Sequence, residues 1–331
     1  MRTTPFGPSG NGIIISRMIS RGEKTKSSRV RITEPYPLTR TLLIKPADAG
    51  LPLIDYLKLR FSYISEEVWL ARISKKWIWF ADGEASAGQK VKAGDILYHY
   101  TPEVVEPSVP DQVRILCDEQ EWMAVYKPAP MPMHQGGRYF KNTLIWILDD
   151  MGYGSLSIVH RLDAVTSGVV LLAKNREMAN RIQNAFSAQR VEKEYLAIVN
   201  GIPEQDEWEV DLPIARKKAF VFDAGHHLPG AKPAVTRFEK LRSTGEYSLI
   251  RCIPLTGRTH QIRLHLKASG FPVADDPIYG DAGDSSGFSL QNRAISLASS
   301  RISIPELGVD VAVKPGEAFS DPVSEQLLLR P

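Results

Sequence analysis

The segment from His160 to Gly168, with the sequence HRLDAVTSG, sets one carboxylate among polar residues, and its residue types are suited to chemistry. Residues 156–159 before it are apolar except for Ser157, and residues 169–173 after it are all apolar, which is typical of short buried strands. The loop that carries Asp163 would therefore be held at both ends. A loop fixed in this way can aim a carboxylate at a substrate.

Two further polar clusters interrupt the apolar pattern downstream. Residues 193–195, Lys-Glu-Tyr, begin a strand-like run, and residues 256–263, TGRTHQIR, lead into a predicted helix on which His260 and Arg263 lie three apart. A basic helix face of this kind suits a phosphate or a carboxylate. An arginine facing Asp163 would favour the ionised carboxylate that a nucleophile or a base needs, whereas a buried Asp–Arg pair that only stabilises the fold is the alternative interpretation.

The composition is that of a globular protein. The chain has 331 residues, of which 43% are hydrophobic and 24% charged, enough for two domains and a sizeable core. Cys117 and Cys252 lie far apart in apolar runs, so we expect core residues in a reducing compartment and neither a disulfide nor a thiolate metal site.

The sequence predicts a cytoplasmic protein that does not enter a membrane. No apolar run approaches the ~20 residues that span a bilayer. The first 22 residues contain no acid, so an organellar presequence or a true start at Met18 remains an alternative.

The basic excess is concentrated near the N-terminus. Residues 1–50 hold nine Lys and Arg against three Asp and Glu, which leaves 41 − 9 = 32 basic and 38 − 3 = 35 acidic residues for the rest. We expect residues 1–49 to form a flexible extension that either attracts phosphate without sequence preference or is simply solvated.

Residues 50–101 have the pattern of a small domain. Apolar residues at helical spacing predict a helix over 53–61, Ser65 is placed to cap a second helix, and residues 77–80 and 91–98 resemble strands. The Pro-rich residues 102–111 predict a semi-rigid linker.

Residues 112–331 combine strands and helices without long βαβ units, so we expect an α+β domain around a mixed, largely antiparallel sheet with flanking helices. The predicted strands are 113–117, 123–126, 195–199, 235–241 and 247–253, and the predicted helices are 143–151, one capped by Asn175, and 259–269.

The motifs resemble those of the RluA-type family of pseudouridine synthases. The similarity rests on residues 160–168, on KEYLAIVNG at 193–201 and on residues 256–280, and it also takes in VYKP at 125–128. It extends over residues 112–322 in the family's motif order. The block 50–101 resembles the small alpha-L RNA-binding domain, so RNA binding or a purely structural role is expected there.

The resemblance implies isomerisation of a uridine within an RNA chain to pseudouridine. Nothing is added or lost in that reaction, so no cofactor and no metal are expected. Asp163 would be the catalytic carboxylate, attacking the anomeric carbon or removing a sugar proton, with Tyr195 stacking on the base and accepting a proton from carbon 5. Arg263 would pair with Asp163, and Arg161 would fill the gap left by the flipped-out base.

The remaining candidate residues are expected to bind the RNA substrate or to shape its site. Thr166 is expected to shape the loop, and a structural role is the alternative for each histidine. Arg216, Lys217 and Lys218 are candidates for phosphate contact. The full set of predicted substrate-binding residues is Arg161, His160, Thr166, Arg258, His260, Gln261 and Lys127.

Two other functions would fit parts of the pattern. A non-catalytic RNA-binding assembly factor would keep the fold without the reaction, and a glycosidase would act on free nucleosides. The intact set of Asp163, Tyr195 and Arg263 disfavours the first, while the accessory block and basic tail disfavour the second. We expect the partner to be ribosomal RNA or transfer RNA and the protein to be a monomer.

Overall fold

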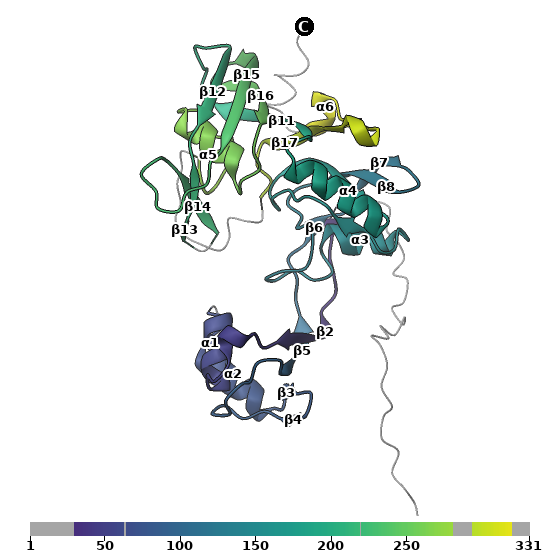
Figure 1. The fold of residues 1–331 in the computed structure, drawn as a ribbon, viewed down its shortest axis with the longest axis vertical. Helices are drawn as coiled ribbons and strands as arrows, with labels where there is room; N and C mark the ends of the chain where they lie inside the picture. Colours follow the sequence, from purple (N-terminus) through teal and green to yellow (C-terminus); the bar gives the residue numbers. More distant parts are fainter. Residues whose placement is uncertain (1–29, 63, 219, 281–292, 320–331) are drawn as a thin grey trace, which may run out of the picture.

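The computed structural model describes residues 30–62, 64–218, 220–280 and 293–319. Two parts are visible in Figure 1, a small N-terminal unit in purple and blue and a larger part in teal, green and yellow. Most of the basic tail that the sequence singled out lies outside the described residues. No helix among the described residues is both long and apolar enough to cross a bilayer.

The N-terminal unit is a four-stranded antiparallel sheet with two helices on one face. Its strand order is β2-β5-β3-β4. Its elements are β2 (Tyr36–Leu43), α1 (Leu53–Arg60), α2 (Glu66–Ser74), β3 (Ile78–Phe80), β4 (Gly83–Glu84) and β5 (Ile96–Val104), with a short 3-10 helix η1 (Pro46–Asp48). Both helices were predicted, and Ser65 occupies the N-cap position of α2.

The boundaries predicted for this unit are wrong at both ends. Strand β2 lies in the segment predicted as a flexible extension, and it pairs with β5 along its whole length, from Tyr36 opposite Val104 to Leu43 opposite Ile96. Strand β5 begins at Ile96, later than the predicted strand, and continues into the predicted linker. The partners are separated by about 60 residues, so no local pattern reveals the pairing.

Two short strands connect this unit to the larger part. Strands β1 (Val30–Arg31) and β6 (Val109–Pro110) pair antiparallel. The carboxylate of Glu106 accepts hydrogen bonds from the backbone N–H groups of residues 140–142 and from the Tyr36 hydroxyl. Arg31 forms an ion pair with Asp150. The chain therefore enters and leaves the N-terminal unit through a double connection.

The larger part is built on a ten-stranded sheet with the path β12-β15-β16-β11-β17-β10-β8-β7, on which β18 pairs with β17 and β9 with β10. Only the β10–β17 pair is parallel among the pairs described. The predicted mixed, largely antiparallel sheet is confirmed. The strands are β7 (Arg114–Asp118), β8 (Trp122–Lys127), β9 (Ser157–Ile158), β10 (Ser167–Ala173), β11 (Glu192–Asn200), β12 (Glu207–Asp211), β15 (Val235–Thr244), β16 (Tyr247–Pro254), β17 (Leu297–Ile304) and β18 (Val309–Ala312).

Helices cover both faces of this sheet. Alternate residues of β8 pack on opposite sides, with Met123 and Val125 toward α3 (Leu144–Asp150), and Ala124 toward α4 (Arg176–Ser187). The Thr143 and Asn175 side chains cap these helices. Beside the sheet lie the hairpin β13 (Ile214–Lys218) and β14 (Val221–Ala224), helices α5 (Gln261–Ala268) and α6 (Pro315–Ala318), and the 3-10 helix η3 (Pro305–Leu307).

The two cysteines differ in burial. Cys252 on β16 is buried in the core, as predicted. Cys117 on β7 is only half-buried, and its thiol donates a hydrogen bond to the Glu119 carboxylate at 3.3 Å. Strand β7 is the edge of the sheet, which explains why an apolar run there is not a core strand.

Candidate active site

A pocket of about 580 Å³ lies where the Asp163 loop, the start of β11 and the start of α5 meet. Residues 159–164, Tyr195 and residues 256–263 line it, so the three polar clusters of the sequence converge. The register explains the convergence, because Gly168 on β10 and Tyr195 on β11 both pair with Ser299 of β17.

The Asp163 loop is fixed by buried groups on both sides of the carboxylate. Leu162 and Val165 are buried in two different apolar clusters, and the Thr166 N–H donates to the Asp163 carbonyl oxygen at 3.1 Å. The Asp163 side chain itself is 31% exposed and faces the pocket. The loop therefore presents one accessible carboxylate on a rigid support.

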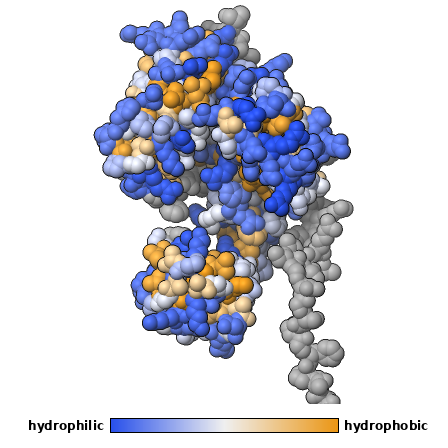
Figure 2. All heavy atoms as spheres, in the orientation of Figure 1, coloured by the Kyte–Doolittle hydropathy of each residue, from blue (hydrophilic) through white to orange (hydrophobic). Residues whose placement is uncertain are grey.

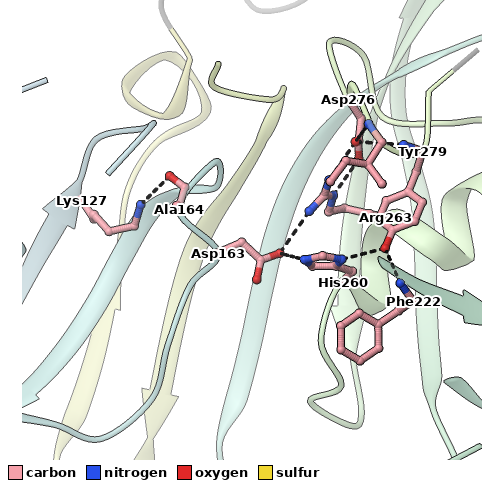
Figure 3. A network of polar contacts seen from close by, with 9 residues as sticks. Lys127, Asp163, Ala164, Phe222, His260, Arg263, Asp276 and Tyr279 are labelled. Carbon is pink, nitrogen blue, oxygen red and sulfur yellow. Dashed lines mark hydrogen bonds and ion pairs between the residues drawn. The ribbon is translucent and has the colours of Figure 1, made fainter. Parts of the chain in front are cut away.

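Lys127 stabilises this loop from behind. Its ammonium donates hydrogen bonds to the carbonyl oxygens of Met131 at 2.9 Å and Ala164 at 3.3 Å, and burial lowers its pKa to about 7, although the Asp163 carboxylate opposes the shift. Figure 3 shows its bond to Ala164. The side chain is fully buried and is not among the residues that line the pocket, so contact of Lys127 with substrate stays a prediction. Its role is to hold the loop.

Arg263 on α5 contacts Asp163, as the sequence predicted, but has a stronger partner. The Nη1 atom lies 3.5 Å from Asp163 Oδ2, while Nε and Nη2 donate to the two Asp276 carboxylate oxygens at 2.7 and 2.8 Å. Burial alone would lower the pKa of Arg263, but the Asp276 and Asp163 carboxylates together raise it. The guanidinium is thus a fixed cation beside Asp163 (Figure 3).

His260 approaches Asp163 from the other side. Its Nε2 lies 3.7 Å from Asp163 Oδ2, and its Nδ1 lies 2.7 Å from the Tyr279 hydroxyl, which accepts a hydrogen bond from the Phe222 N–H. If Tyr279 donates to Nδ1, the proton of the neutral imidazole lies on Nε2 and points toward Asp163. Burial lowers the pKa of His260 against the pull of Asp163, which favours this neutral form.

The backbone at His260 supports a functional role. His260 has φ +59°, in the left-handed region that few residues other than glycine adopt, asparagine, aspartate and histidine more often than the rest. Such strain is found mainly at functional sites, where the surroundings hold it in place. Here the hydrogen bond to Tyr279 and the buried helix that follows supply that support.

Tyr195 lies at the start of β11, at a β-bulge between Glu194 and Tyr195, and its side chain lines the pocket. Burial, together with the nearby Asp163 carboxylate, raises the pKa of its phenol. The ring therefore stays uncharged at neutral pH, which suits stacking on a base.

Of the other predicted substrate-binding residues, Arg161, Thr166 and Arg258 line the pocket. Arg161 and Arg258 are exposed, and the Arg258 Nε donates to the Pro233 carbonyl oxygen at 2.9 Å. Thr166 is buried and shapes the loop, as expected.

Two predicted substrate contacts have structural roles. The Gln261 amide oxygen accepts from the Thr256 hydroxyl and the Arg258 N–H, and its nitrogen donates to Val235 and Thr236, so all its bonds hold residues 256–261 against β15. His160 Nε2 accepts a hydrogen bond from the Leu171 N–H at 2.9 Å. Each lines the pocket, yet these bonds fix the local backbone.

Asp276 and Tyr279 were missed as site residues. They follow α5 in a turn, ADDPIYG, where the Asp276 carboxylate also accepts the N–H groups of Ile278 and Tyr279. The motif lay within the recognised residues 256–280, but nothing local indicates that its aspartate reaches back to Arg263. Arg216, Lys217 and Lys218 are exposed on β13.

Comparisons with known proteins identify the family of this chain. A family model described as RNA pseudouridylate synthase matches residues 121–268. The chain is 32% identical over 280 residues to "RNA pseudouridine synthase 7" of Oryza sativa subsp. japonica, covering 82% of this chain and 71% of that protein. It is 31% identical over 256 residues to "tRNA pseudouridine(32) synthase, mitochondrial" of Saccharomyces cerevisiae, covering 76% of this chain but only 55% of that protein.

The structure titled "Human RNA Pseudouridylate Synthase Domain Containing 1" superposes with a TM-score of 0.54 at 24% identity, covering 66% of this chain and 86% of that one, which shows a shared fold. The chain belongs to the RluA-type family of RNA pseudouridine synthases. It is accordingly an isomerase. The family model does not include the N-terminal unit, whose resemblance to the alpha-L domain stays a prediction.

Proposed function

We propose that this protein isomerises specific uridines of ribosomal or transfer RNA to pseudouridine, with Asp163 as the essential carboxylate. The observation that carries the proposal is the position of Asp163, an accessible carboxylate on a rigid loop between a fixed guanidinium and an imidazole. The transfer RNA activity in the name of the yeast relative supports one of the two substrate classes.

The pocket suits a base turned out of its helix. Unstacking a base costs a few kcal/mol, and the exposed Arg161 at the pocket supplies a guanidinium plane that can stack in the space left behind. Tyr195 presents an uncharged ring within the pocket for the flipped base. A phenol that stays protonated can accept the carbon 5 proton only if its own proton leaves at the same time.

Asp163 would act on the sugar while the uracil remains bound. The departing uracil anion is resonance-stabilised and is recaptured through carbon 5, so one carboxylate suffices where glycosidases use two. Arg263 keeps its positive charge throughout, and the neutral His260 can donate toward the same carboxylate oxygen. Both interactions position Asp163 and leave its carboxylate ionised.

The test is pseudouridine mapping by carbodiimide-dependent primer extension on total RNA from cells whose only copy is wild type or Asp163→Asn. We expect one or a few stops in ribosomal or transfer RNA to disappear in the variant, which also names the substrate. Asp206→Asn, at a side chain 85% exposed, is the matched control and should leave the map unchanged. An unchanged map with expressed Asp163→Asn would favour the assembly-factor alternative.

A further inference from the structure

The sheet of the N-terminal unit carries four aromatic side chains on one face. Trp79 of β3 pairs with Tyr98 of β5, and their rings stack with centroids 5.5 Å apart at 23°. Next to them Trp77 and Tyr100 form an edge-to-face pair at 6.3 Å. All four rings are only half-buried, so part of each ring faces solvent.

These rings are not part of the core of the unit. Side chains alternate along a strand, and the neighbouring Ile78, Phe80 and Leu97 are the ones that pack with α1 and α2. The open face continues onto β2 with Thr39 and Thr41, opposite Tyr100 and Tyr98 respectively.

The same face ends in apolar side chains that are exposed. Leu43 of β2 is 63% exposed and pairs with Ile96 of β5, which is 38% exposed. The space-filling view in Figure 2 shows apolar side chains at the surface of this unit, whose helices also expose Leu59, Val68 and Leu70. An aromatic and apolar sheet face of this kind marks an interaction surface.

Positive charges lie at both ends of this face. Lys75 Nζ is 4.7 Å from the centroid of the Trp77 ring. Lys45 and Lys92 are exposed in the turns next to Leu43 and Ile96. Two of the acids nearby are engaged, since Glu84 pairs with Lys76 and the Asp95 carboxylate accepts the Lys92 N–H.

We propose that this aromatic face binds a single-stranded segment of the RNA, with bases stacked on Trp77, Trp79, Tyr98 and Tyr100. Proteins that bind single strands combine aromatic rings for the bases with cations for the phosphates, and the face has both. The Thr39 and Thr41 hydroxyls can bond base edges. The proposal rests on the proposed function only in taking RNA as the substrate.

The helices of the unit are the less suitable surface. The first turn of α2 carries Glu66 and Glu67, both exposed. Glu66 pairs with Lys58, so Glu67 is the carboxylate of this turn that would repel phosphates. The sheet face thus fits RNA better than the helical side that the alpha-L resemblance suggests.

The experiment measures binding of the full chain to a fluorescein-labelled 12-nucleotide single-stranded RNA and to a 12-base-pair RNA duplex, by anisotropy at 100 mM salt. The test variant is Trp79→Ala with Tyr98→Ala, and Leu59→Ala with Leu70→Ala on the helical side is the matched control, since both leucines are exposed. We expect the test variant to lose at least about tenfold in affinity for the single strand, with duplex binding and the control unchanged.

A second measurement does not depend on the alanine variants folding. Stacking of bases on Trp77 and Trp79 should quench tryptophan fluorescence of the unmodified chain on titration with the single strand, and Trp79→Phe with Tyr98→Phe should keep the affinity within about threefold. Equal single-strand affinity of wild type and a folded test variant would overturn the proposal. The proposal would also be overturned if the wild-type chain were a dimer and the test variant a monomer. The aromatic face would then bind a second copy of the chain.

These outcomes are separate from those of the proposed function. Binding requires no turnover, so the two proposals can fail independently. If the wild-type chain is inactive but the Trp79→Ala, Tyr98→Ala variant binds the single strand more weakly, the proposed reaction is wrong and the aromatic face is still an RNA site. If the wild-type chain is active and the variant keeps its affinity for the single strand, the proposed reaction stands and the aromatic face is not an RNA site.

Discussion

At the scale of single residues, the site depends on a carboxylate that does not face the pocket. Asp276 binds the Arg263 guanidinium through two hydrogen bonds and leaves Nη1 directed at Asp163. Arg263 is buried, so without Asp276 it would turn or lose its compensation. Asp276 is therefore a positioning residue for Asp163, the carboxylate that we propose as catalytic.

Asp276→Asn should lower kcat by about 100-fold with little change in KM, because the guanidinium loses its fixed orientation. It should also destabilise the fold by about 3 kcal/mol, since the buried Arg263 guanidinium loses the negative charge of the Asp276 carboxylate. Asp275→Asn, at the exposed neighbouring aspartate, is the control for both effects. Single-turnover kinetics on substrate RNA and denaturant unfolding measure them, and wild-type kcat in a folded Asp276→Asn protein would show that Arg263 needs no second carboxylate.

Sequence reasoning identified the residues that face the pocket more successfully than those that hold them. Asp163, Tyr195 and Arg263 stand in polar clusters that interrupt apolar strands, and the family motifs assigned them. Asp276 and Lys127 act through long-range geometry that no spacing reveals. A lysine is normally solvent-exposed, so its burial behind the Asp163 loop could not be expected from its type.

At the scale of elements, the parallel contact of β10 and β17 sets the position of the loop. Gly168 lies in this contact, opposite Ser299, with φ +115°, and a Cβ there would lie 2.2 Å from the Ser299 carbonyl oxygen and 2.4 Å from its nitrogen. Backbone cannot yield as a flexible side chain can. Glycine is required here both by its dihedral angle and by the approach of the neighbouring strand.

Gly168→Ala should therefore lower the free energy of unfolding by about 2–4 kcal/mol, because the two strands must separate. Activity should fall as well, since Asp163 lies in the loop just before this strand. Gly88→Ala, where no atom lies within 4 Å of the added Cβ, should change the stability by less than about 1 kcal/mol. Urea unfolding of the wild type, Gly168→Ala and Gly88→Ala measures these changes. Equal midpoints for all three would mean that β10 and β17 can separate without a cost in free energy.

The helices were the best-predicted elements, and the pairing of β2 with β5 was the worst. Helices α3 and α4 each follow a Thr or Asn whose side chain accepts the backbone N–H three residues on, a local signal that sequence shows directly. The register of β2 and β5 depends on the whole fold of the N-terminal unit, and the proline-rich composition of residues 102–110 hid the end of β5.

At the scale of the whole molecule, two histidines tie stability to pH, the buried His99 and the half-buried His160. Burial, with the nearby Lys193, lowers the pKa of His160 to about 4, and burial, with Arg72 and Arg40, lowers that of His99 to about 4. Histidine in an unfolded chain has a pKa of about 6.5. Between pH 6.5 and 4 the unfolded chain thus binds protons that the folded protein does not.

The free energy of unfolding should consequently fall as the pH drops through this window, by about 1.4 kcal/mol per pH unit for each histidine. His160→Gln should remove one histidine's share of the slope, and His226→Gln, at an exposed histidine, should leave the slope as in wild type. Urea unfolding at pH 6.5, 5.5 and 4.5 measures it. An identical slope in His160→Gln and wild type would mean that His160 has the same pKa in the folded and unfolded states.

The double connection of the N-terminal unit decides how that unit can be removed. Deleting residues 1–100 would take away β1 and β2, so Glu106 would lose the Tyr36 hydroxyl and the remainder of β5 its partner. Leu38 and Thr101 are register partners, so an Asn-Gly turn can join them in place of residues 39–100 and close a hairpin. This excision keeps the Arg31–Asp150 ion pair as well.

The excised protein is the chain in which the Asn-Gly turn replaces residues 39–100. We expect it to unfold cooperatively and to keep isomerase activity at saturating RNA, because every residue that lines the active-site pocket lies beyond residue 131. Its RNA affinity should fall, and the slope of log affinity against log salt should become shallower, because the excision removes Lys45, Lys75 and Lys92, the cations proposed to contact phosphates. The deletion of residues 1–100 should be less stable than the excised protein, by urea unfolding. If instead the protein without residues 1–100 folds and the protein without residues 39–100 does not, strands β1 and β2 do not stabilise the catalytic part. The N-terminal unit would then be attached to that part only through the covalent chain.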